Sequence, residues 1–174
     1  MRKNVVLSVS TMIMQIIRVL ISLSAAIQVV LLIGFFINDM PMQEIIPEFQ
    51  KLIYNSNNGL QIQEFPENHH WLSYLLIAQN LLTLVLLFSI LGYGIDIIKN
   101  IGKRKTFTDL NIEAFDKVSR LAVILFFLQL LKLSPGRIGL AIEFNFLFLA
   151  FGSIILTQVF KEGHRLLEEN ELTV

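Results

Sequence analysis

The chain has 174 residues, of which 54% are hydrophobic and only 16% are charged, and its formal net charge is zero. Soluble domains usually carry about 25% charged residues, and a neutral chain has no overall field that would attract nucleic acid. The absence of cysteine excludes disulfides, thiolate metal sites and thiol catalysis. Length and composition therefore indicate a membrane protein of one domain.

The N-terminal segment starts with two basic residues and continues as a long apolar run. Residues 1–18 are typical of an amphipathic lead-in, and residues 19–38 predict a first uncharged span, about 30 Å long as a helix. A cleaved signal peptide is the alternative. Arg18 interrupts the apolar core that such a peptide needs, and the apolar run continues well beyond it, so we expect the span to remain.

Residues 39–70 form the first polar segment, which we expect to be an outer loop. Within it, residues 47–54 predict a short helix on the membrane surface, because apolar side chains recur there at helical spacing. Residues 60–65 alternate between apolar and polar side chains for a few positions, which is a weak strand signal. His69 and His70 are adjacent and cannot face one metal ion from a helix, so we interpret them as membrane-interface residues.

The longest uncharged stretch, residues 71–95, predicts the second span, because a helix of this length reaches about 37 Å. The basic cytosolic loop, residues 96–118, follows it. Thr108 in this loop is the expected N-cap of a helix, and Phe107 is placed to pack against Ile112 one turn later. That helix should continue without a break into the third apolar run.

Residues 119–133 and 144–160 are the third and fourth apolar runs. The third is short, and it crosses a membrane only if Arg120 and Lys132 extend to opposite interfaces. The alternative is a shallow re-entrant hairpin made of both runs. Such a hairpin would leave backbone groups unpaired in lipid, so two spans are favoured. The tail, residues 161–174, should continue the last helix for a few turns.

Lysine and arginine set the orientation of membrane helices, because the segments that carry more of them stay in the cytoplasm. The predicted inner segments hold eleven of these residues, and the outer segments hold three, namely Lys51, Lys132 and Arg137. Both termini are therefore expected in the cytoplasm. We predict an all-α membrane protein, a bundle of four transmembrane helices in the lipid bilayer.

Short patterns in the second half of the chain resemble one known family. The first is the spacing of Gly102, Phe107 and Asn111 before the third span, and the second is the C-terminal sequence QVFKEGHRLLEENELTV directly after the last span. They resemble the YoaS-like domain of unknown function, an uncharacterised bacterial family of four-span membrane proteins. The resemblance implies a place in the bacterial inner membrane and a gene beside a Cro/CI-type helix-turn-helix regulator.

This resemblance leads to the first functional hypothesis, a regulatory or sensory scaffold that holds a soluble DNA-binding regulator at the membrane. The regulator would bind the cytosolic loop and the tail, because the motif-like residues gather there. The predicted contact residues are Gly102, Phe107, Asn111, Glu169, Asn170 and Glu171.

Polar residues inside or beside the predicted spans lead to a second hypothesis. These residues are Gln28, Gln79, Asn80, Gln129, Glu143, Asn145 and Gln158. Side-chain amides within spans usually form hydrogen bonds between helices. The more specific alternative is that they line a polar pathway in a small transporter, exporter or immunity-type protein. Glu143 lies at the outer mouth of the last span, where it is solvated or paired with Arg137, and a proton relay is its alternative role.

Residues 99–105 form a basic run next to the membrane. The commonest role of such a run is to orient the neighbouring spans and to attract anionic lipid. We expect no direct nucleic-acid binding, since no aromatic interleaving or base-reading module accompanies the run. The sequence has no phosphate-binding loop, no Ser/His/Asp residues in the chain order of a catalytic triad and no metalloprotease motif. We therefore expect no enzymatic activity, no cofactor and no metal site. The sequence leaves a homo-oligomer open.

Overall fold

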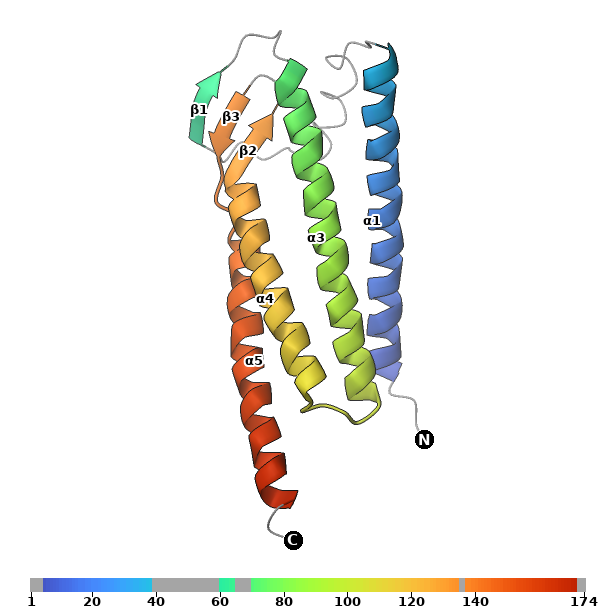
Figure 1. Ribbon diagram of the computed structural model, residues 1–174, viewed down its shortest axis with the longest axis vertical. Coiled ribbons are helices and arrows are strands. Elements are labelled where there is room, and N and C mark those ends of the chain that lie inside the picture. The colour runs from blue at the N-terminus through green and yellow to red at the C-terminus, as the bar shows by residue number, and fades with distance from the viewer. Residues whose placement is uncertain (1–4, 39–59, 65–69, 135–136, 172–174) are drawn as a thin grey trace.

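The computed structural model describes residues 5–38, 60–64, 70–134 and 137–171 of the chain. These residues form a bundle of long helices with a small sheet at one end (Figure 1). The helices are α1 (Val5–Asn38), α3 (His70–Gly102), α4 (Asp109–Leu130) and α5 (Phe144–Glu171), and the strands are β1 (Leu60–Glu64), β2 (Leu131–Ser134) and β3 (Arg137–Leu140). We call the end with the sheet the sheet end. The opposite end, with the α3–α4 connection and the last turns of α5, is the terminal end.

Three helical stretches of the described residues are long and apolar enough to cross a membrane, namely Val5–Gly34, Tyr74–Gly102 and Phe144–Asn170. Their outward faces carry large apolar side chains, such as Val6 at 73% and Phe148 at 71% exposure. Soluble proteins rarely expose apolar surface on this scale, whereas lipid covers it without cost. These helices are therefore membrane helices, which agrees with the membrane class expected from composition.

The helix α1 is continuous through both the predicted lead-in and the predicted first span. It packs along α3, and Arg18 lies in this contact, with its guanidinium carbon 3.9 Å from the centre of the Phe88 ring. Gly92 lies beside the guanidinium, and a Cβ there would make an ordinary van der Waals contact with it at 3.7 Å. An aromatic face stabilises a cation by a cation–π interaction, which explains how the apolar run accommodates Arg18.

The helix α4 begins after Thr108 and runs without a break into the third apolar run, as predicted. The predicted third span was wrong at its end, because residues 131–133 belong to strand β2 and not to a helix. The backbone becomes extended at Leu131, with φ −86° and ψ 103°. Pairing of β2 with β3 then satisfies backbone groups that a continued helix would have bonded internally.

The sheet is antiparallel, with the strand order β1-β3-β2, and it closes the connection between α4 and α5. Leu140 of β3 lies opposite both Leu60 of β1 and Leu131 of β2. The weak strand signal at residues 60–65 is confirmed by β1, whereas β2 and β3 were missed and the all-α prediction holds only for the bundle. The predicted surface helix at residues 47–54 lies outside the described residues.

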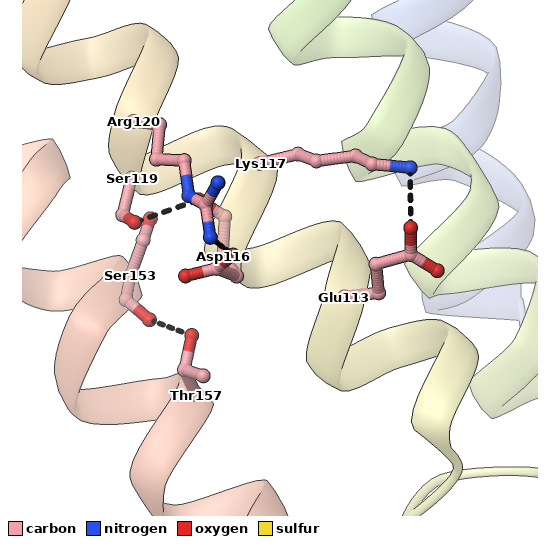
Figure 2. A network of polar contacts seen from close by, with 7 residues as sticks. All are labelled: Glu113, Asp116, Lys117, Ser119, Arg120, Ser153 and Thr157. Atoms are coloured by element: carbon pink, nitrogen blue, oxygen red, sulfur yellow. Dashed lines mark hydrogen bonds and ion pairs between the residues drawn. The ribbon is translucent and has the colours of Figure 1, made fainter.

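The contact between α4 and α5 is built from small side chains. Ser119 and Ala122 of α4 and Ala150, Ser153 and Thr157 of α5 are all buried. Figure 2 shows how the hydroxyls in this contact are satisfied: Ser119 donates to the Asp116 carbonyl at 2.8 Å, and Thr157 donates to the Ser153 carbonyl at 2.8 Å. Small side chains let two helices approach closely, which is the usual basis of helix packing in membranes.

Two glutamines hydrogen-bond across helices at the sheet-end half of the bundle. The Gln79 amide nitrogen on α3 donates to the Leu128 and Leu131 carbonyls, each at 2.6 Å. The Gln129 amide nitrogen on α4 donates to the Thr83 hydroxyl at 2.9 Å. The last carbonyls of α4 have no partner within the helix, so Gln79 supplies donors that lipid does not offer.

We expect Gln79→Leu to lower the free energy of unfolding by about 1–2 kcal/mol, because two interhelical hydrogen bonds to carbonyls are lost. Gln158→Leu is the matched control, since Gln158 is exposed on α5 and the substitution removes no interhelical bond described here. Denaturant unfolding in detergent micelles measures both variants. Equal stability of the two variants would show that Gln79 does not hold α3 to α4.

Candidate functional site at the terminal end

The centre of the terminal end is Asn111, which is fully buried in the first turn of α4. Its side-chain oxygen Oδ1 accepts a hydrogen bond from the Asn100 side-chain amide at 2.9 Å. Its side-chain nitrogen Nδ2 donates to the Lys105 backbone carbonyl at 2.9 Å and to the Thr106 backbone carbonyl at 2.7 Å. A buried amide with all these partners stabilises a single loop conformation, because losing any one of them leaves a buried polar group unpaired.

The connection between α3 and α4 has a defined shape around Asn111. The helix α3 ends at Gly102, and Arg104 has a φ of 62°, a left-handed conformation that reverses the chain direction. Thr108 is the N-cap, as predicted, but its side chain makes no capping hydrogen bond. The Thr108 hydroxyl is instead buried with no partner among the described residues, so the N-cap position is confirmed without its usual side-chain hydrogen bond.

Phe107, the middle residue of the predicted motif, packs against α5. Its ring centroid is 5.3 Å from that of Phe160, which also contacts Phe115 at 4.9 Å. Gly163 makes this contact possible, because a Cβ at that position would lie 2.5 Å from the Phe107 ring. This contact with α5 is a partner for Phe107 that the local helix-start pattern did not predict.

His164 joins the connection to the tail by hydrogen bonding. Its Nδ1 lies 2.9 Å from the Phe107 carbonyl, across 57 residues of sequence. Its Nε2 lies 3.5 Å from an Asp109 carboxylate oxygen and 3.4 Å from one of Glu168. A backbone carbonyl can only accept, so the contact at Nδ1 is a hydrogen bond in the tautomer that carries its proton there.

Sequence reasoning missed Gly163 and His164, although a signal for Gly163 was present. Glycine inside a helix costs about 1 kcal/mol relative to alanine, so a glycine in a helical tail indicates a close contact. No comparable signal identifies His164, because its partner carbonyl lies in a segment far away in sequence. The same holds for the small residues between α4 and α5, whose pairing depends on the fold.

The predicted contact residues fall into two groups. Phe107 is half-buried and Asn111 is fully buried, so both residues pack inside the terminal end. Gly102, Glu169 and Asn170 are exposed, the last two on α5, and the side chain of Glu171 lies outside the described residues. The structure thus brings the loop and the tail together through Phe107, and the prediction that they bind a partner stays a prediction.

The last turns of α5 extend beyond the α3–α4 connection (Figure 1). Arg165 pairs there with Glu162 at 2.7 Å and Glu169 at 3.4 Å. Leu166 and Leu167 are 49% and 48% exposed. This projecting end of α5 is an acidic helix with two exposed leucines, a combination that suits contact with another molecule.

Two of the polar residues predicted within the spans, Gln79 and Gln129, meet at Thr83, whose hydroxyl donates to the Gln79 backbone carbonyl at 2.9 Å and accepts from the Gln129 side-chain amide at 2.9 Å. Gln79 and Gln129 bond between helices, and Asn80 is half-buried on α3. The side-chain oxygen Oε1 of Gln28 is buried on α1 with no hydrogen-bond partner among the described residues. The remaining three, Glu143, Asn145 and Gln158, are exposed at or near α5.

Comparison with known families identifies the chain at the level of its family. The family described as "Protein of unknown function (DUF2975)" matches residues 42–174. The chain belongs to this DUF2975 family. Searches of curated proteins and of solved structures gave no match. The expectation of an uncharacterised family is confirmed, whereas the YoaS-like name and the neighbouring regulator gene stay predictions.

In this DUF2975 protein we expect Gly163→Ala to destabilise the terminal end by about 1–3 kcal/mol, because the new methyl group must displace the Phe107 ring. Gly152→Ala is the matched control on the same helix. A Cβ there meets nothing within 4 Å, so the better helix propensity of alanine should leave stability unchanged or raise it. Denaturant unfolding in micelles measures both, and a harmless Gly163→Ala would refute the close contact.

Proposed function

We propose that this DUF2975 protein crosses the bacterial inner membrane four times, with both termini in the cytoplasm. The packing of α4 supports the fourth crossing, because α4 lies against both α3 and α5, and its second half, residues 121–130, is uncharged. The excess of lysine and arginine in the predicted inner segments supports the orientation. The terminal end is then cytoplasmic and the sheet end external.

The topology is testable because the chain has no natural cysteine. Single cysteines at Asp109, Ile142 and Glu169 are all at exposed positions. A membrane-impermeant maleimide should label the Ile142 position in intact spheroplasts, and it should label the other two only after lysis. Labelling of Asp109 and Ile142 from the same side would show that α4 does not cross the membrane.

Within this topology we propose a regulatory or sensory scaffold that binds a soluble DNA-binding regulator at the terminal end. The observation that carries the proposal is the contact of His164 with the Phe107 carbonyl at 2.9 Å. It joins the predicted loop and tail into one surface. A surface whose segments are already held together loses little entropy when a partner binds.

The chemistry of this surface supports a protein partner more than a small molecule. The projecting end of α5 offers Leu166 and Leu167 as apolar contacts, and the residues around them are charged. Apolar contacts with a charged rim are typical of protein interfaces, where charge sets orientation. The assignment of the partner as a helix-turn-helix regulator rests on the family resemblance. We accordingly propose a binding role and no catalytic one.

The alternative of a transporter, exporter or immunity-type protein depended on polar residues within the spans. Two of these, Gln79 and Gln129, already donate hydrogen bonds to neighbouring helices. Their arrangement matches the structural role of amides between membrane helices. The scaffold is therefore the function that the contacts at the terminal end support best.

A photo-cross-linking amino acid at Leu166 tests the scaffold in cells of the native host. We expect illumination to join the protein to a soluble protein with a helix-turn-helix domain, identified by mass spectrometry. The matched control is the same amino acid at Phe151, which is also exposed on α5 but lies within the predicted last span. Capture of the same proteins from both positions, or of no DNA-binding protein from Leu166, would contradict the proposal.

A further inference from the structure

A cleft of about 360 Å³ lies between the C-terminal half of α3 and the N-terminal half of α4. Three lysines line it, one from α3, one directly after α3 and one from α4, together with two carboxylates, a tyrosine and an asparagine. The sequence predicts only a general attraction of residues 99–105 to anionic lipid and assigns no role to this cleft. Its position between two membrane helices and its excess of cations make it a candidate for an anionic ligand.

The lysines of the cleft are not equivalent. Lys117 donates to Glu113 at 2.7 Å, and this hydrogen bond raises the pKa of Lys117 above its ordinary value. This pair is therefore close to neutral as a unit. Lys99 lies in the last turn of α3 and Lys103 directly after that helix, and they make no ion pair within the part of the chain that the structure describes. They face one other carboxylate in the cleft, Asp96, which leaves an excess of one positive charge.

The backbone that carries these lysines is held in place. Asn100 lies between them in sequence, lines the cleft and donates its amide to the buried Asn111. The Lys103 amide also bonds to the carbonyls of Lys99 at 3.1 Å and Asn100 at 3.0 Å. The backbone that carries the two lysines is thus fixed at the end of α3, which reduces the entropy lost on binding a ligand.

The cleft lies where α3 leaves its uncharged stretch. Tyr93 lines one end of the cleft, and Asp96 is the first charged residue after residues 71–95. Tyrosine is enriched at the level of lipid headgroups, so this position places the cleft beside them. Basic pockets between membrane helices at this level are typical binding sites for anionic headgroups.

We propose that this cleft binds the phosphate group of an anionic phospholipid whose headgroup also carries hydroxyls. Lys99 and Lys103 would bind the phosphate, and the Asp96 carboxylate would accept a hydrogen bond from a headgroup hydroxyl. Phosphatidylglycerol has both groups. Phosphatidylcholine has no hydroxyl there and adds a cation that the two lysines repel. Soluble glycerol phosphate has the same polar chemistry without acyl chains.

The experiment titrates the purified full chain in neutral detergent micelles with these three probes, and it needs no partner protein. We expect the wild type to bind phosphatidylglycerol at least tenfold more tightly than phosphatidylcholine or glycerol phosphate. The double variant K99Q/K103Q should lose about tenfold or more in affinity for phosphatidylglycerol, since each lysine near a membrane surface contributes about fivefold. K99R/K103R keeps both charges and should retain binding.

The matched control is R104Q/K105Q, which removes the same charge from the same basic run outside the cleft lining. We expect this control to lose less than threefold in affinity. Equal losses in the two double variants would overturn the proposal, because they would show diffuse attraction and no site. Equal affinity for glycerol phosphate and phosphatidylglycerol would overturn the assignment to a lipid. Thermal unfolding of each variant confirms that the fold is intact.

Discussion

The hydrocarbon of a membrane offers no hydrogen bonds, so every backbone group within it needs a partner in the protein. The sheet end shows how this chain meets that constraint where α4 ends. Gln79 donates to the Leu128 and Leu131 carbonyls, and the Ala141 amide donates to the Leu130 carbonyl at 3.0 Å. The connection from α4 to α5 is thereby satisfied, and α5 can return along α4.

At the terminal end a buried side chain, in place of a sheet, satisfies the backbone carbonyls of a connection. Asn111 binds two loop carbonyls and the Asn100 amide, and so it holds the connection between α3 and α4 in one shape. That shape presents Phe107 to α5, where Gly163 has room for the ring. The order of the proposed docking surface therefore depends on one buried asparagine and one glycine.

The two proposed binding surfaces use different parts of the terminal end. The lipid cleft lies between α3 and α4, whereas the exposed leucines lie on the projecting end of α5. The α3–α4 connection nevertheless contributes to both sites, because Lys103 of the cleft directly follows Gly102, a predicted contact of the regulator.

Much of the bundle could be predicted from local patterns. Hydropathy located α1, α3 and α5, and the start of α4 at Thr108 followed from turn chemistry and helical spacing. Resemblance in the loop and tail identified an uncharacterised family, and the match to DUF2975 confirms this. The spacing of Phe107 and Asn111 was visible as a motif, but their burial and contacts were not.

The sequence by itself determined that lipid surrounds this chain, because long uncharged runs have no other favourable surroundings. Only the tertiary structure decided what the local patterns left open. The third run ends in a strand because β3 is there to pair with β2, and Phe107 turns to α5 because Gly163 lacks a side chain. Both outcomes depend on residues distant in sequence, whose approach no local pattern encodes.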